Sequence, residues 1–189
     1  MKKILLIVLV LIVGCAKEPE PINLEELDAR KDGYYTKDPN ELYTGAVFLL
    51  HKSGEKRADG YIKAGKIDGK MTVYYENGPI GSEINYKDGE LDGKKTRYYE
   101  NGQIFYIKNY KDGKQDGKWT YYNENGQIDT EGNFKDGKRY GKWTYYYENG
   151  QIYFEGNYKD GQRDGKWTYY YENGQILKEV NYKDGELNK

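Results

Sequence analysis

A unit of 24 residues recurs along this chain without insertion, and this repeat restricts the possible folds more than any other feature. The strings GKWTYYNENGQI, GKWTYYYENGQI and GKWTYYYENGQI begin one period apart at Gly117, Gly141 and Gly165. Weaker copies begin at Gly93, Gly69 and Gly45, so six copies run from residue 45 to residue 188. A repeat of this length is one supersecondary unit, which buries its apolar face only by stacking on its neighbours.

Two turn signals divide each copy into two strands. Asn-Gly occurs at 77, 101, 125, 149 and 173, and Lys-Asp-Gly occurs at 87, 111, 135, 159 and 183. Both dipeptides favour the positive φ angles of type I′ hairpin turns. The runs between them are rich in Tyr, Trp, Thr and Ile, which are typical of strands. We therefore predict an all-β fold, an elongated and twisted antiparallel meander of stacked 24-residue β-hairpin repeats.

The position of the turns predicts which residues share a face of the sheet. A two-residue turn at Asn149-Gly150 would put Trp143 opposite Gly156, where an indole can cover backbone that has no side chain of its own. Opposed residues lie on the same face. The predicted pairs are Tyr147 with Ile152, Tyr146 with Tyr153, Tyr145 with Phe154, Thr144 with Glu155 and Trp143 with Gly156.

The second turn of each repeat keeps the same alternation. Pairing across Asp136-Gly137 sets Thr130 opposite Trp143, so the aromatic residues continue along one face of the whole array. The twist of a sheet this wide should curve that face into a shallow trough. The other face is predicted to be polar, with a ladder of Tyr and Thr.

The first fifteen residues have the organisation of a signal peptide. Lys2 and Lys3 precede an apolar stretch from 4 to 13, which is too short to span a bilayer as a permanent helix. The tetrad that ends at Cys15 resembles the bacterial lipobox, in which the Cys is lipidated and becomes the new N-terminus. Residues 1–15 are therefore expected to be a lipoprotein signal peptide. The resemblance implies an anchor at Cys15 in the bacterial cell envelope, on the outer membrane or the extracytoplasmic face.

Residues 16–44 carry no repeat. They are polar and contain Pro19, Pro21 and Pro39, which favours a tether between the anchor and the array. Within this segment, residues 23–27 begin with a residue of N-cap type and have apolar positions three apart. One short helix is predicted there.

Charge and side-chain chemistry disfavour several classes of function. The formal net charge is −1, with 30 Lys and Arg against 31 Asp and Glu, so we expect no nucleic-acid partner. The paired Asp-Gly segments are explained by turn chemistry, and we expect neither a metal nor a cofactor. His51 is the only His, and no Ser or Cys pattern surrounds it. The chain is not expected to be an enzyme.

The repeat itself resembles a known family. The pattern G-K-W-T-Y-Y-Y-E-N-G-Q-I followed by Y-K-D-G-K is similar to MORN repeats, in particular to a bacterial variant associated with antitoxins. The resemblance covers about residues 45 to 189 and is carried by Gly117, Trp119, Tyr121, Tyr122, Glu124, Asn125, Gly126, Gly132, Lys135, Asp136, Gly137 and their equivalents one and two periods later. It implies stacked hairpins that act as scaffolds and protein-binding surfaces. The lipobox is a departure from an intracellular antitoxin.

The aromatic columns are the candidate binding residues. They could bind sugar rings or an extended segment of a partner, or they could form only the core of a thin sheet. We expect a non-catalytic, membrane-anchored scaffold that binds protein at the cell envelope. Binding of carbohydrate or cell-wall polymer through a Trp and Tyr trough is the first alternative, and an antitoxin or immunity role is the second. The candidates are Trp119, Trp143, Trp167, Tyr121, Tyr145 and Tyr169.

Overall fold

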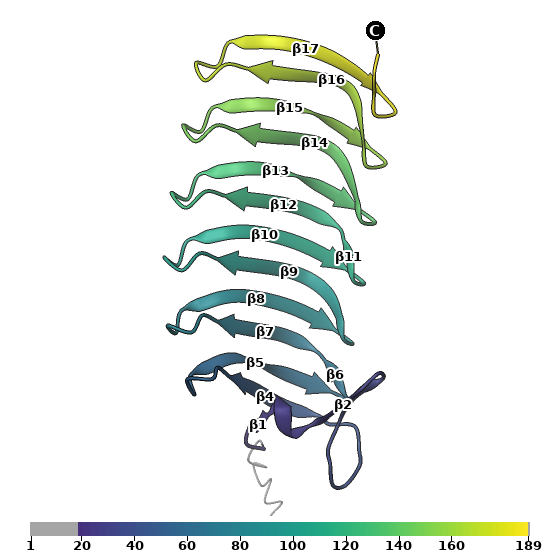
Figure 1. Ribbon diagram of the computed structural model, residues 1–189. Coiled ribbons are helices and arrows are strands. Elements are labelled where there is room, and N and C mark those ends of the chain that lie inside the picture. Colours follow the sequence, from purple (N-terminus) through teal and green to yellow (C-terminus); the bar gives the residue numbers. More distant parts are fainter. Residues whose placement is uncertain (1–18, 189) are drawn as a thin grey trace, which may run out of the picture.

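The repeats form one open sheet in which each hairpin pairs only with its neighbours (Figure 1). The computed structural model describes residues 19–188. The strands are β1 (Ile22–Asn23), β2 (Asp28–Arg30), β3 (Gly33–Tyr35), β4 (Gly45–Leu50), β5 (Lys56–Lys63), β6 (Lys66–Ile67), β7 (Gly69–Tyr74), β8 (Ile80–Lys87), β9 (Glu90–Tyr98), β10 (Ile104–Lys111), β11 (Lys114–Gln115), β12 (Gly117–Tyr122), β13 (Ile128–Lys135), β14 (Lys138–Tyr146), β15 (Ile152–Lys159), β16 (Gln162–Tyr170), β17 (Ile176–Lys183) and β18 (Glu186–Leu187). One turn of 3-10 helix, η1, spans Leu24–Glu26.

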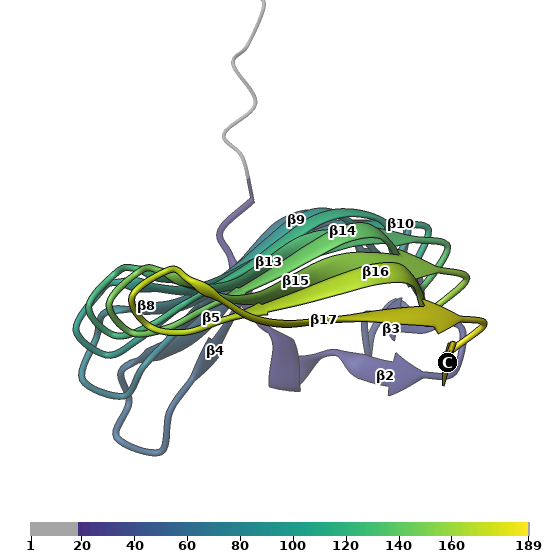
Figure 2. The ribbon, with the colours of Figure 1, turned by 90° about the horizontal axis from the view of Figure 1, so that it is seen from above.

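The predicted all-β meander is confirmed. Sixteen strands form one sheet in the order of the sequence, and β2 and β3 form a separate pair. All the repeat strands pair antiparallel, whereas β1 pairs parallel with β4 at the first edge of the sheet. Viewed along the array, the strands bend into an arch (Figure 2). We call the concave side of this arch the inner face. Leu27 packs on Val47 there, and the tryptophans share this face because Trp143 lies opposite Gly156 as Val47 lies opposite Gly60.

The Lys-Asp-Gly turns adopt the predicted conformation. Asp136 and Gly137 have φ angles of 49° and 82°, as a type I′ turn requires, and the equivalent Asp and Gly residues of the other repeats also have positive φ. Each turn also bonds to the hairpin before it, since the Gly137 N–H donates to the Gln115 carbonyl at 2.8 Å. The turns are therefore linked along that side of the array.

The Asn-Gly turns differ from the prediction. Asn149 keeps a negative φ, and only Gly150 is left-handed, at 83°. The Gly150 N–H donates to the Tyr147 carbonyl at 2.9 Å, and the Tyr147 N–H donates to the Gln151 carbonyl at 2.8 Å. This is a three-residue loop made of a type I turn and a glycine bulge, rather than a two-residue type I′ turn.

The longer loop changes the register next to it. Tyr146 lies opposite Ile152, and Tyr153 is the extra residue of a bulge, so the predicted pairs of Tyr147 with Ile152 and Tyr146 with Tyr153 are wrong. The pairs further from the turn are as predicted, with Tyr145 opposite Phe154, Thr144 opposite Glu155 and Trp143 opposite Gly156.

A second register shift follows the Lys-Asp-Gly turn. Thr130 lies opposite Tyr145 rather than Trp143, because the pairing shifts between Glu131 and Asn133. The shift equals two residues, and side chains alternate with a period of two. It therefore moves no side chain to the other face, and the aromatic residues stay together.

The segment predicted as a tether folds against the array over its described part. Asn23 caps η1 by accepting a hydrogen bond from the Glu25 N–H at 3.1 Å, so the predicted short helix is a single 3-10 turn. Leu27 is buried and packs on Val47 and Ile62 of the first hairpin. This segment places β2 and β3 beneath the arch (Figure 2), because the apolar inner face of β4 and β5 needs a cover.

Cys15 and the signal-peptide residues lie outside the described residues. Between residues 19 and 188, no helix has the length and apolar character needed to cross a membrane.

Candidate functional site

The three tryptophans are core residues of the inner face. Trp119, Trp143 and Trp167 are 5%, 2% and 0% exposed. Trp143 lies opposite Gly156, but its indole covers Gly132 of the preceding repeat, and Trp167 covers Gly156 in the same way. A Cβ at either glycine would collide with the ring. The indoles therefore hold adjacent hairpins together and present little ring surface to a ligand.

The neighbouring tyrosines are more accessible. Tyr121, Tyr145 and Tyr169 are half-buried on the same face. Tyr145 stacks on Phe154 with ring centroids 4.2 Å apart, and burial raises the pKa of its phenol. The two predicted columns are thus brought together on one face, with the tryptophans below and the tyrosines at the surface. Ligand binding by the tyrosines stays a prediction.

Cations lie over the tryptophans. The Lys108 ammonium is 4.5 Å from the centre of the Trp119 ring, and the guanidinium carbons of Arg139 and Arg163 are 4.6 and 4.4 Å from Trp143 and Trp167. Such contacts are cation–π interactions. Burial first, and then the charges of Lys95 and Arg97, lower the pKa of Lys108.

Hydroxyl groups hold the two arginines in place. Arg139 Nη1 donates to Tyr158 Oη at 2.9 Å and to Tyr145 Oη at 3.2 Å. Arg163 repeats the arrangement with Tyr182 and Tyr169, at 3.0 and 3.2 Å. Each guanidinium is thus fixed at one nitrogen, while its ring contact positions the planar group on the inner face.

Six cations occupy inner-face positions in β9, β10, β14, β16 and β17. In the sheet, Lys95 lies opposite Lys108 and Arg97 lies opposite Tyr106. Lys178 lies opposite Tyr169. We call these residues the basic row. The row consists of Lys95, Arg97, Lys108, Arg139, Arg163 and Lys178.

The outer face balances its own charges. Lys118, Lys142 and Lys166 pair with Glu131, Glu155 and Glu179 at 2.8, 2.8 and 2.9 Å, and Lys70 pairs with Glu83. Tyr146 Oη also donates to Glu131 at 2.9 Å. The hydrogen bond from Lys118 holds the pKa of the Glu131 carboxyl below its usual value. A column of buried threonines, Thr96, Thr120, Thr144 and Thr168, lies between these pairs.

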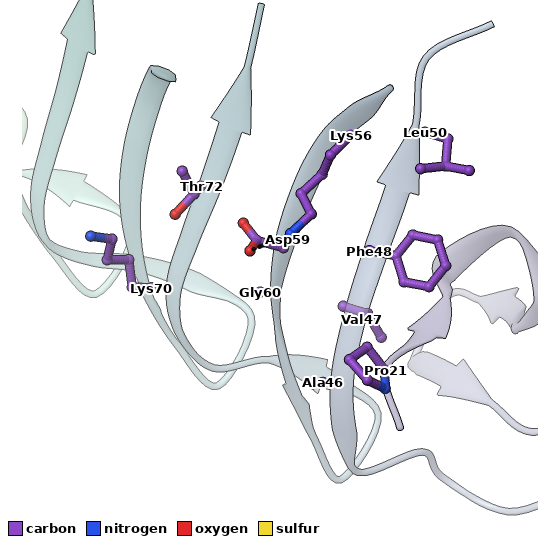
Figure 3. A pocket seen from close by; sticks show the side chains of 10 residues that line it. All are labelled: Pro21, Ala46, Val47, Phe48, Leu50, Lys56, Asp59, Gly60, Lys70 and Thr72. Atoms are coloured by element: carbon purple, nitrogen blue, oxygen red, sulfur yellow. Dashed lines mark hydrogen bonds and ion pairs between the residues drawn. The ribbon is translucent and has the colours of Figure 1, made fainter. Parts of the chain in front are cut away.

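Two hollows lie on opposite faces of the sheet. One of ≈ 240 Å³ lies on the inner face between Trp119 and Trp143, and Arg139 and Asp129 line it. The other, of ≈ 630 Å³, lies beside the first hairpin and is lined by Phe48, Leu50 and Pro21 together with Lys56 and Asp59, which form an ion pair at 3.5 Å (Figure 3). Phe48 occupies the position that Thr72 has in the next repeat, which makes this end of the outer face apolar.

The Asp residues that follow the turns have a structural role. Asp116 Oδ2 accepts a hydrogen bond from the backbone N–H of Asp136 at 3.4 Å, and Asp68 and Asp92 bond to Asp88 and Asp112 in the same way. Within residues 19–188 no group of acidic, His or Cys side chains could hold a metal ion. His51 Nε2 contacts the Tyr74 carbonyl at 3.1 Å, which places it in the hairpin end of the first repeat.

These features define a class of protein, an open array of stacked β-hairpins with two accessible faces. A family model, described as the MORN repeat variant, matches residues 67–88, 91–112, 115–136, 139–160 and 163–184. The matches cover more than half of the chain, and the protein belongs to this family. Among curated proteins, none matches this chain. The β4–β5 hairpin lies outside the matched residues, although its Val47 lies opposite Gly60 as Trp143 lies opposite Gly156.

The basic row is the feature that the sequence reasoning missed. The charges were counted over the whole chain, where they cancel. The alternation that put Trp143 and Tyr145 on one face also puts Arg139 there, since the three residues are spaced by even numbers. Counting charges separately for each face would have found the row.

Proposed function

We propose that this protein is a non-catalytic, membrane-anchored scaffold that binds another protein at the bacterial cell envelope. The observation that carries the proposal is the open sheet, whose two faces repeat the same side chains at a constant spacing. Stable protein interfaces bury about 800 Å² on each partner. A single-layer array of this length offers such an area on either face, and the MORN repeat variant family fits a repeat protein that binds other molecules.

The anchor is supported by the sequence around Cys15. A diacylated Cys binds membranes stably, whereas a single acyl chain gives only marginal binding. Metabolic labelling with a fatty-acid analogue should mark the wild-type protein, and Cys15→Ser should abolish the label and release the protein from the membrane fraction. An unlabelled wild-type protein in a bacterial host would contradict the anchor.

Protein binding is tested by cross-linking in cells that carry the full chain. A photoreactive amino acid replaces Tyr169 on the inner face or, in a second variant, Tyr140, which is 54% exposed on the outer face. One discrete protein adduct from either position supports the scaffold. If neither position gives an adduct at natural expression levels, the proposed function is wrong.

A second candidate is the binding of envelope polymer. The observation that favours it is the partial exposure of Tyr121, Tyr145 and Tyr169. The tryptophans are unsuitable for the test, because their removal would damage the core. Sedimentation with purified cell-wall polymer, lost in Tyr121→Ser and Tyr169→Ser, would favour this candidate. An immunity role against a secreted toxin would be one form of the proposed protein binding.

A further inference from the structure

The basic row lacks the partners that the outer lysines have. Three of the outer pairs have N–O distances of 2.8 to 2.9 Å. Over the described residues 19–188, no carboxylate forms an ion pair with any member of the basic row. Asp129 borders the inner hollow, where it accepts a hydrogen bond from Thr130 Oγ1 at 2.8 Å. The inner face therefore has a positive potential that the chain itself leaves unbalanced.

The arginines can still donate hydrogen bonds. Arg139 and Arg163 use Nη1 for the tyrosine hydroxyls, and the Tyr158 hydroxyl also interacts with Arg163. Over residues 19–188, no further hydrogen-bond acceptor is bound to either guanidinium. A guanidinium with free N–H groups binds carboxylates in a bidentate geometry. The cations also cover the indole rings, so these rings are not free to stack on a sugar. This chemistry favours carboxylates over neutral sugar rings.

The spacing of the row suits an extended chain that crosses the strands. Arg139 and Arg163 are one repeat apart, which is two strands or about 10 Å. Three residues of an extended or polyproline-like chain also span about 10 Å. At β4 and β5, a segment of this chain already lies across the inner face, with Leu27 packed on Val47 and Ile62 (Figure 2). That segment includes the 3-10 turn η1, and it shows that the inner face can be covered by polypeptide.

We infer that the inner face over β9–β17 binds an extended acidic segment of a partner protein, whose carboxylates pair with the basic row. The inference rests on the proposed scaffold function, and it names the chemistry of the partner. The tyrosine rings beside the cations would contact the backbone and the aliphatic stems of the bound segment.

The test uses the full-length protein in detergent micelles and a synthetic peptide of repeated Glu-Ser-Gly units. The three tryptophans lie under cations of the row, so their fluorescence reports binding directly. Removing two charges with R139Q/R163Q should weaken binding about tenfold. The matched control K142Q/K166Q removes two charges from the same repeats of the outer face, and should change binding by less than about twofold. The peptide with Gln in place of Glu should not bind.

A second variant tests whether binding is lost because charges are removed and not because the protein unfolds. K95Q/R97Q leaves the tyrosine-bound arginines in place and should also weaken binding, while circular dichroism stays that of the wild type. The inference would be overturned if the outer variant K142Q/K166Q weakened peptide binding as much as the inner variants do. It would also be overturned if the Glu peptide did not bind at low salt. Tighter binding of an acidic polysaccharide or of anionic vesicles than of the peptide would overturn it as well.

Failure of this inference can be told apart from failure of the proposed function. A protein adduct that forms only from Tyr140 would keep the scaffold and overturn the inner-face site. Absence of adducts from both positions would overturn the scaffold itself.

Discussion

The two faces of this sheet are built from the same repeat but satisfy their polar groups differently. On the outer face, Lys142 and Glu155 of adjacent strands form an ion pair, and the pattern recurs along the array. On the inner face, Arg139 lies on Trp143 with tyrosine hydroxyls as its partners. The comparison teaches that a repeat with almost no net charge can still present a charged surface, because alternation sorts the charges onto opposite faces.

Packing also differs between the faces. The inner face contains the largest buried side chains, Trp143 and Trp167, each placed over a glycine of the preceding repeat. On the outer face, the buried side chains among residues 19–188 are those of the small threonine column. Stability should therefore depend mainly on the inner face.

The largest expected effect is the loss of a buried indole. Trp143→Ala should lower the free energy of unfolding by about 3 to 5 kcal/mol, because it removes the contact that joins two hairpins. The adjacent outer residue is the control, and Lys142→Ala should cost less than about 1 kcal/mol. Urea denaturation followed by circular dichroism measures both. Similar losses for the two variants would contradict the assignment of the core to the inner face.

A smaller effect is expected at the glycine beneath an indole. Gly156→Ala places a Cβ against the Trp167 ring, which must shift, and should cost about 1 to 3 kcal/mol. Asn157→Ala is the matched control on the exposed outer side of β15, with an expected change within about 0.5 kcal/mol. The midpoint of thermal unfolding, measured for Gly156→Ala and Asn157→Ala, compares their stabilities. If Gly156→Ala is as stable as the control, the close approach of Trp167 to β15 is incorrect.

The parts of the fold that depend on local signals could be predicted from the sequence. The type I′ conformation at Asp136-Gly137 follows from residue preference alone. The pair of Trp143 with Gly156 is as predicted because the extra residue of the bulge, Tyr153, restores the register that the longer loop shifts. The three-residue loop at Gly150 could not be predicted in this way. Asn-Gly is compatible with both loop lengths, and the choice depends on hydrogen bonds of the closing residues Tyr147 and Gln151.

The parts that depend on contacts between distant residues could not be predicted. The packing of Leu27 on Ile62 joins residues far apart in sequence, and polarity alone suggested a tether. The indole of Trp143 lies over Gly132 rather than over its opposed residue Gly156, a contact between repeats that the register alone does not specify. For the candidate site, the sequence indicated the aromatic columns, but their division into buried Trp and half-exposed Tyr required the structure.

Removal of one inner cation should have an intermediate effect on stability. Arg139→Gln deprives Tyr145 and Tyr158 of a donor and removes the contact with Trp143, which together should cost about 1 kcal/mol. Lys142→Gln in the same strand breaks an exposed pair and should cost less than about 0.5 kcal/mol. Chemical denaturation at neutral pH distinguishes the two. A larger loss for the outer variant would reverse the comparison between the faces.

The smallest effect should appear as a difference in pH dependence. Glu131 has a pKa lowered chiefly by the hydrogen bond from Lys118, so the folded carboxyl binds a proton less readily than the unfolded one. Its contribution is fully present above the unfolded pKa, about 4.3, and is lost as pH falls through the folded pKa. The stability of Glu131→Gln should therefore fall less between pH 5 and pH 3 than that of the wild type, by a few tenths of a kcal/mol (order of magnitude). Arg139→Gln should keep the wild-type slope, because its guanidinium stays charged across this range and pairs with hydroxyls rather than a carboxylate. If stability no longer falls between pH 5 and pH 3 in Arg139→Gln but falls as in the wild type in Glu131→Gln, the acid-sensitive charge pair lies on the inner face.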